Sequence, residues 1–255
     1  MDNTNFMSSL NKNQNYFWKS TLVPFVIVAI MWSVYGWEKY MKVSLNSFGT
    51  LPRDLVGLRG ILFSPFIHGG FDHIVSNTFP VLILGTAIYY FYRKSANYVV
   101  LYSFLMTGLW TWAMARSSFH IGASGLIYAW GAFLFASGAI NKNKRMMGLS
   151  LLVVFIYGSL IWGVLPLMPN ISFESHLFGA IAGFILAYVF RKDGPQRKKH
   201  IWETKEEDYE IEFWNMTQEE INAYYLQKRQ EKTSIQNRTE VRINYEYKPK
   251  SSDSA

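Results

Sequence analysis

The chain has 255 residues, of which half are hydrophobic and 17% aromatic, and its formal net charge is +7. It contains no Cys, which excludes disulfides, thiol catalysis and cysteine metal sites. The charge excess lies entirely in residues 1–190, which hold 12 Lys or Arg and 5 Asp or Glu, whereas residues 191–255 hold 13 of each. Because such an excess between hydrophobic runs is typical of membrane orientation, we expect no nucleic-acid partner.

Six uncharged runs divide the first three quarters of the chain. A membrane-spanning helix needs about 20 apolar residues. The runs cover residues 20–37, 73–92, 95–115, 117–141, a part of 146–173, and 175–190. They predict an all-α polytopic membrane protein: a cytoplasmic segment over 1–19, a six-transmembrane-helix bundle over 20–190, and a short charged cytoplasmic tail over 191–255, partly helical or disordered.

Basic residues in the short connections predict the orientation. Arg93 and Lys94 lie between the second and third runs, three more between the fourth and fifth, and five directly after the sixth. The connection between the fifth and sixth runs has no Lys or Arg. By the positive-inside rule both termini are cytoplasmic. The second, fourth and sixth runs therefore all begin at the external face, at similar depth.

Polar residues occur at the beginnings of these three runs. His73 and Asn77 are four residues apart, so they share one face of a helix. Ser124 stands between Gly122 and Gly125, and His176 opens the sixth run. Polar side chains at membrane depth are costly unless they face a cavity or find partners. We therefore expect the three openings to converge on one site.

These residue types suit nucleophilic catalysis. A serine hydroxyl becomes a nucleophile when a histidine removes its proton. The oxyanion that results needs donors, which an Asn amide, a His ring and a helix N-terminus can supply. Tyr128, one turn after Ser124, can place its ring against the imidazole of His176. Since the apolar runs contain no Asp or Glu, the pattern predicts a Ser–His dyad without a carboxylate.

Each residue also has a simpler interpretation. Ser124 alone is typical of close helix packing, and so is the pair Gly179 and Gly183. We accept packing for that pair, because it would bring the sixth helix against the fourth. His73 and Asn77 alone could only join helices. A metal site at His68 is not expected, since no HExxH motif is present, and no cofactor is predicted.

Three motifs in order resemble those of the rhomboid intramembrane serine proteases of the six-span bacterial type. They are "HGGFDHIVSN" at 68–77, "GASG" at 122–125 and "HLFGAIAG" at 176–183. The resemblance implies that Ser124 is the nucleophile and His176 the general base. It also implies that His73, Asn77 and the backbone N–H of Ser124 stabilise the oxyanion, that Tyr128 packs on the imidazole, and that His68 joins the polar network.

The resemblance further implies the partners and the location of the protein. The substrates would be transmembrane segments of other proteins in the lipid bilayer of a bacterial inner membrane, cleaved near their external ends. The family often carries Trp-Arg in the first external loop, where this chain has Leu58 and Arg59. Ser175 stands where alanine is usual.

Two other functions remain open from the sequence. A related membrane protein could bind client transmembrane helices without cutting them, although such relatives typically lack the serine or the histidine. A transporter is a weaker alternative because the chain shows no inverted internal repeat. In the tail, Thr217 and Glu220 predict a capping box at the start of a short helix over 217–232.

Overall fold

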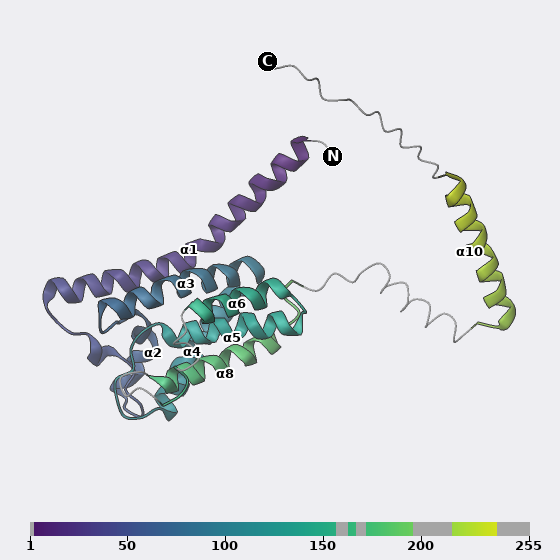
Figure 1. The fold of residues 1–255 in the computed structure, drawn as a ribbon. Helices are drawn as coiled ribbons and strands as arrows, with labels where there is room; N and C mark the ends of the chain where they lie inside the picture. The colour runs from purple at the N-terminus through teal and green to yellow at the C-terminus, as the bar shows by residue number, and fades with distance from the viewer. Residues whose placement is uncertain (1–2, 157–162, 167–171, 196–215, 239–255) are drawn as a thin grey trace, which may run out of the picture. The chain divides into compact units, whose positions relative to one another are not determined.

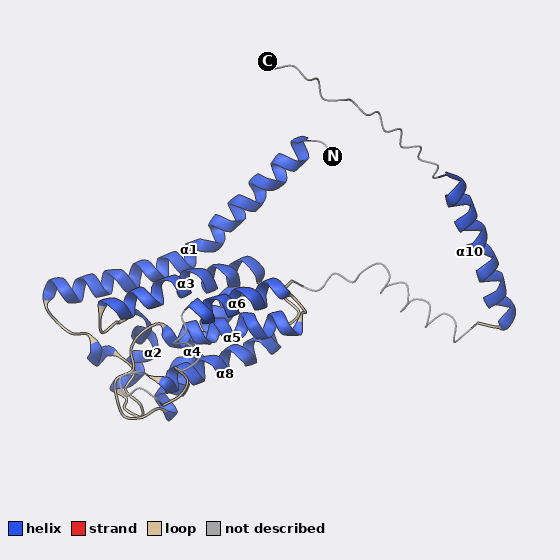
Figure 2. Cartoon of the chain, in the orientation of Figure 1, coloured by secondary structure: helices blue, strands red, loops and turns tan. Residues whose placement is uncertain are grey.

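In the computed structural model, residues 3–156, 163–166, 172–195 and 216–238 are described. Every regular element within these ranges is a helix (Figure 2), beside one isolated bridge between Thr50 and His120. The all-helical fold predicted from the sequence is thereby confirmed. The chain divides into two compact units, Met1–Arg197 and Lys198–Ala255.

Among its described residues, the first unit contains six long helices and a set of short ones (Figure 1). The long helices are α1 (Asn3–Met41), α3 (Phe71–Phe91), α4 (Ala96–Met114), α5 (Ser124–Ile140), α6 (Lys144–Ile156) and α8 (Phe173–Val189). The connection from α1 to α3 folds into the 3₁₀ turns Asn46–Phe48, Val56–Arg59 and Ser64–Phe66 around the short helix α2 (Gly60–Phe63).

In the part of the chain that the structure describes, two helical segments are long and apolar enough to cross a membrane, Tyr16–Met41 and Phe71–Phe91. The apolar helices α5 and α8 have 17 residues each, and α4 has 19. The fifth predicted span is described only in part, because residues 157–162 and 167–171 lie outside the described ranges. The count of six spans therefore stays a prediction.

Helix α5 lies at the centre of the bundle. It contacts α3, α4, α6 and α8, and the large side chains of Trp130 and Phe133 on it are fully buried. The indole N–H of Trp130 donates to the hydroxyl of Ser103 on α4 at 2.9 Å. This satisfied donor lets α5 keep a large aromatic ring in the apolar core.

Small residues allow α8 to approach α5 closely. A Cβ atom at Gly179 would lie 2.1 Å from the carbonyl oxygen of Gly125, and one at Gly183 would lie 2.1 Å from that of Ala129. Neither position can hold a larger residue unless the backbones separate. The two helices therefore touch through their backbones, as small-xxx-small patterns do in membrane bundles.

The two ends of this bundle differ in chemistry. The helices α3, α5 and α8 begin at the end that carries Ser124 and His176, which we call the serine end. Arg93 follows α3 and Lys192 follows α8 at the opposite end, which we call the basic end.

The second unit contains α10 (Gln218–Arg238). The backbone N–H of Thr217 donates to Glu220 Oε2 at 2.8 Å, and the N–H of Glu220 donates to Thr217 Oγ1 at 3.4 Å. This is the capping box that the sequence predicts. The backbone hydrogen bond from Thr217 lowers the pKa of the Glu220 carboxyl. Residues 196–215 and 239–255 of the predicted tail lie outside the described residues.

Candidate active site at the serine end

Ser124 is the first residue of α5 and follows a tight turn. Gly122 has φ +101°, a conformation that other residues rarely adopt. Its N–H donates to the carbonyl of Ser64 at 2.8 Å, which ties the turn to the connection before α3. Because Ser124 begins the helix, its own N–H belongs to the first turn, whose donors have no intrahelical partner.

Ser124 and His176 are joined by a hydrogen bond. The distance from Ser124 Oγ to His176 Nε2 is 2.7 Å. The other ring nitrogen, Nδ1, lies 2.8 Å from the carbonyl oxygen of Gly163. A carbonyl only accepts, so Nδ1 carries the proton, and Nε2 presents its lone pair to the serine hydroxyl. The Gly163 carbonyl therefore fixes the tautomer that a general base needs.

Tyr128 holds the plane of the imidazole. Its ring is stacked on that of His176, with centroids 4.2 Å apart and planes inclined by 15°. Tyr128 lies one turn after Ser124 on α5, so the same helix supplies both the hydroxyl and the ring. His176 is thus held on one side by a hydrogen bond and on one face by an aromatic ring.

His73 and Asn77 reach the turn before Ser124 from α3. A Cβ atom at Gly122 would lie 2.7 Å from His73 Nε2 and 3.6 Å from Asn77 Nδ2. Asn77 is only 4% exposed, and its Nδ2 has no hydrogen-bond partner among the described residues. A buried amide donor without a partner costs stability. This donor lies beside the Ser124 turn, where an acceptor that enters the site could take its hydrogen bond.

His68 lies behind this group, in the connection before α3. Its Nε2 accepts the N–H of Ala123 at 3.4 Å, and its Nδ1 lies 3.4 Å from the carbonyl of Phe66. The ring packs edge to face against His73, with centroids 5.0 Å apart. Burial, with a smaller contribution from His73, lowers the pKa of His68 to about 3. His68 is therefore neutral and supports the loop just before the serine.

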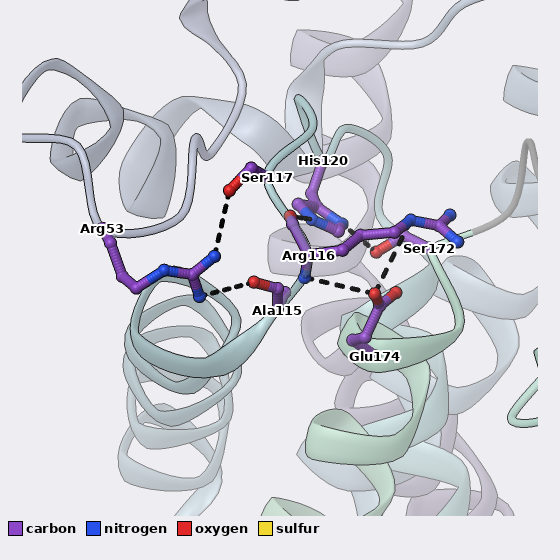
Figure 3. Close-up of polar contacts among 7 residues, drawn as sticks. All are labelled: Arg53, Ala115, Arg116, Ser117, His120, Ser172 and Glu174. Atoms are coloured by element: carbon purple, nitrogen blue, oxygen red, sulfur yellow. Dashed lines mark hydrogen bonds and ion pairs between the residues drawn. The ribbon is translucent and has the colours of Figure 1, made fainter.

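Polar contacts also connect the loops around the site. Figure 3 shows Arg53, from the connection after α1, reaching the segment between α4 and α5. Its guanidinium donates to the carbonyl of Ala115 at 2.7 Å and to the hydroxyl of Ser117 at 3.0 Å. The connection after α1 is thereby fastened to the segment that leads to Ser124.

A second set of contacts in Figure 3 joins the segment between α4 and α5 to the start of α8. The backbone N–H of Arg116 donates to Glu174 Oε1 at 3.3 Å, and the Arg116 Nε forms an ion pair with that oxygen at 3.6 Å. His120 Nε2 donates to the Arg116 carbonyl at 3.0 Å, while His120 Nδ1 accepts from the Ser172 hydroxyl. These contacts fix the segment between α4 and α5 relative to the first turn of α8, which carries His176.

Three residues of this arrangement were missed by sequence reasoning. Gly163 acts through its carbonyl, which every residue possesses, so no sequence signal marks it. His120 was left out of the predicted chemistry, although its position four residues before Ser124 was a usable signal. Glu174 lies just outside the apolar runs, and it contacts Arg116 rather than the histidine.

A small polar cavity lies beside the serine turn. Its volume is about 20 Å³, and Gly122, Gly125 and Ser175 line it. The buried hydroxyls of Thr107 and Thr111, which also line it, have no partner among the described residues. Such a space is about the size of one water molecule. Elsewhere in the described ranges, no three His, Asp or Glu side chains gather in a way that could hold a metal ion.

A family model and several known proteins match this chain. The family model described as Rhomboid domain matches residues 57–193. An uncharacterised protein of Mycobacterium leprae is 32% identical over 188 residues, which cover 70% of this chain and 72% of that protein. An uncharacterised protein of Mycobacterium tuberculosis is 29% identical over 188 residues, with 70% and 77% covered.

A protein of Bacillus subtilis named Putative rhomboid protease YdcA is also similar. It is 27% identical over 137 residues, which cover 50% of this chain and 65% of that protein. Because the Rhomboid domain model matches more than half of the chain, from the connection before α3 to the residues after α8, the protein belongs to the rhomboid family and is an integral membrane protein.

Proposed function

We propose that the protein is an intramembrane serine endopeptidase that cleaves transmembrane segments of other membrane proteins with Ser124 and His176. The observation that carries the proposal is the pair of contacts on the His176 ring, 2.7 Å to Ser124 Oγ and 2.8 Å to the Gly163 carbonyl. Together they orient an unprotonated ring nitrogen toward a serine hydroxyl at a helix start.

The proposed reaction begins when His176 Nε2 takes the proton of the Ser124 hydroxyl. The serine oxygen attacks the carbonyl carbon of the substrate amide and gives a tetrahedral oxyanion. The protonated imidazole then donates its proton to the amide nitrogen, which leaves as an amine and produces an acyl-enzyme. In the second half, His176 takes a proton from water, the hydroxide attacks the ester, and the serine regains its proton.

Three donors in the proposal face the oxyanion: the His73 ring, the Asn77 amide and the Ser124 backbone N–H. The unpartnered Nδ2 of Asn77 supports this assignment, since a donor kept free in the resting site needs no rearrangement when charge develops. The partial positive charge at the start of α5 would also stabilise the oxyanion. The small polar cavity beside Gly125 offers the second half-reaction a place for water.

The proposed membrane arrangement has six spans: α1, α3, α4, α5, a span that includes α6, and α8. Residues 1–19 and 191–255 are then cytoplasmic, and the membrane domain covers residues 20–190. The basic residues at the end opposite Ser124 support this orientation under the positive-inside rule. The serine end then faces the outside of a bacterial inner membrane, so substrates would be cut near their external ends. A substrate helix must unwind locally, because its amide groups are otherwise paired and shielded.

The test uses purified protein reconstituted in lipid. A fluorophosphonate probe is expected to label the wild-type protein but not Ser124→Ala, and only the wild type should cleave a reporter transmembrane segment. A folded wild-type preparation that binds the segment but neither reacts nor cleaves would favour the alternative, a rhomboid-like protein that binds client helices without cutting them.

A further inference from the structure

A groove runs between α1 and α3 at the basic end of the bundle. Its volume is about 790 Å³, and aromatic or aliphatic side chains line it almost completely. Several of them are well exposed, including Trp18 at 69%, Leu22 at 62% and Phe25 at 61% on α1, with Tyr90 on α3 at 37%. The groove is therefore an apolar site open to the surroundings of the protein.

Contacts between α1 and α3 lie at both ends of the groove. A Cβ atom at Gly85 of α3 would lie 2.8 Å from Pro24 Cγ of α1, so the two helices touch at that level. Nearer the basic end α1 meets α3 again, where the ring centroids of Tyr16 and Tyr90 lie 5.7 Å apart, and the groove lies between the two contacts.

A second cavity adjoins the groove. It has a volume of about 420 Å³, and its charged lining residues are Arg93, Lys94, Lys192 and Asp193. Among the described residues, neither Lys94 nor Lys192 has a carboxylate at ion-pair distance. Three cations against one carboxylate leave this pocket with an excess of positive charge.

The two cavities share Tyr90 and Phe91. An apolar groove thus leads, past two aromatic rings, into a basic pocket. We propose that this composite site binds an anionic glycerophospholipid, with an acyl chain in the groove and the phosphate in the pocket. A net-negative head group matches the excess positive charge, whereas a zwitterionic head would bring its own cation near the lysines.

The side chain of Arg93 is oriented by a contact with Tyr16. Its guanidinium carbon lies 3.4 Å from the ring centroid of Tyr16, a cation–π contact with α1. The Tyr16 hydroxyl donates to the carbonyl of Tyr89 at 2.7 Å, which fixes the ring against the end of α3. A planar guanidinium offers paired donors to phosphate oxygens. Because stacking on Tyr16 already restricts the side chain, Arg93 loses less conformational freedom when a phosphate binds.

The experiment is native mass spectrometry of the full chain released from detergent with equal amounts of phosphatidylglycerol and phosphatidylcholine. The wild type is expected to retain phosphatidylglycerol preferentially. Lys94→Gln/Lys192→Gln should weaken that retention roughly 10- to 30-fold, since each cation near a lipid head group contributes about 1 kcal/mol. Thr86→Trp, which fills the groove from α3, should weaken it while the charges remain.

The matched control is Lys142→Gln/Lys144→Gln, which removes the same charge from two exposed lysines at the same end of the bundle, one in the turn after α5 and one at the start of α6. It should leave retention within about twofold of the wild type, because those lysines do not line the pocket. Equal losses in both double variants would mean that general surface charge attracts the lipid and would overturn the proposal. Equal retention of the two lipids, or a dimer or a bound peptide in place of lipid, would overturn it as well. The Ser124→Ala protein can serve throughout, so the outcome does not depend on the proposed protease activity.

Discussion

Two helix pairs of the same bundle are packed in opposite ways. Helices α5 and α8 meet at Gly179 and Gly183, so closely that an added Cβ at either position would lie 2.1 Å from a backbone carbonyl oxygen. Helices α1 and α3 touch near Pro24 and again at Tyr16, and between these contacts they leave a groove of about 790 Å³ lined by large side chains. The first pair fixes two side chains to hydrogen-bonding distance, whereas the second leaves room for a flexible molecule.

The difference shows where this chain needs precision. A bond of 2.7 Å between Ser124 and His176 tolerates little relative movement of α5 and α8. Backbone contact through glycines has no rotamers to average over, and the loop contacts of Glu174 and His120 add to it. The hydrogen bond from the Tyr16 hydroxyl to the Tyr89 carbonyl also joins α1 to α3, but it lies at the basic end, away from Ser124 and His176. We expect substitutions at the interface between α5 and α8 to lower the rate of cleavage, and substitutions on α1 to leave that rate unchanged.

The largest effect is expected from removing the reactive pair. Ser124→Ala and His176→Ala should each lower cleavage of a transmembrane substrate in proteoliposomes by about 10⁴-fold or more, since either change disables the nucleophile. Ser33→Ala is the matched control, because this exposed serine of α1 bonds only its own helix, at Ala29. Cleavage by Ser124→Ala within tenfold of the wild-type rate would refute the assigned nucleophile.

A smaller loss is expected for Asn77→Ala. If the Nδ2 group donates to the oxyanion, it acts in the transition state, so kcat should fall by about 10² or less while KM changes little. His73 and the Ser124 backbone N–H would remain as donors. Steady-state kinetics and thermal unfolding are measured on one preparation. A normal kcat together with a lowered melting temperature would mean that Asn77 only joins helices.

Gly179→Ala tests the close interface directly. The new methyl group would lie 2.1 Å from the Gly125 carbonyl, so the helices must separate. Overpacking of this kind typically lowers the free energy of unfolding by about 1–3 kcal/mol, and we expect cleavage to fall with it because His176 moves away from Ser124. The measurement is thermal unfolding in detergent beside a cleavage assay.

Gly36→Ala on α1 is the control for that substitution. A Cβ at Gly36 meets nothing within 4 Å, and alanine favours a helix over glycine by about 1 kcal/mol. Stability should hold or rise, with cleavage unchanged. If both glycine variants behaved alike, the contrast between the two interfaces would have no functional meaning.

Much of this organisation could be predicted from the sequence. The uncharged runs predicted the helical membrane fold, and the spacing of "GASG" and "HLFGAIAG" predicted the rhomboid family; the helical fold and the family are confirmed. The hydrogen bond between Ser124 and His176 is the geometry this pattern anticipates. The catalytic roles themselves stay predictions.

The features that the sequence does not predict depend on how distant segments are placed together in the fold. The Gly163 carbonyl accepts a hydrogen bond from His176 only because the fold brings Gly163 beside that ring. Since every residue has a carbonyl, the residue type gives no sign of this contact. Glu174 stands just outside the uncharged runs, where no motif marks it, but burial and a contact with Arg116 make it part of the site's support. Exposed aromatic residues such as Trp18 resemble any lipid-facing side chain in sequence, so the groove emerges only when α1 and α3 are placed together.

The smallest expected effect is a change in how stability depends on pH. Burial is the main cause that lowers the pKa of His120, against the Arg116 carbonyl and the Glu174 charge, which raise it, while the Arg116 charge lowers it. A histidine whose folded pKa lies below its unfolded value binds its proton more readily in the unfolded chain. Its contribution to stability is therefore complete above about pH 6.5, the unfolded pKa, and is lost as pH falls below it.

The melting temperature of the wild type should accordingly fall between pH 7.5 and pH 5, and His120→Gln should reduce the slope, because glutamine keeps polar contacts but does not titrate. Part of the slope should persist in this variant, since His68, whose pKa is lowered to about 3, contributes with the same sign. Ser172→Ala removes the hydroxyl that bonds His120 Nδ1 but leaves the ring able to titrate. It should lower the melting temperature at every pH with the slope retained. Parallel curves for the wild type and His120→Gln would show that the loop contacts of Figure 3 fix α8 without any contribution from the charge state of His120.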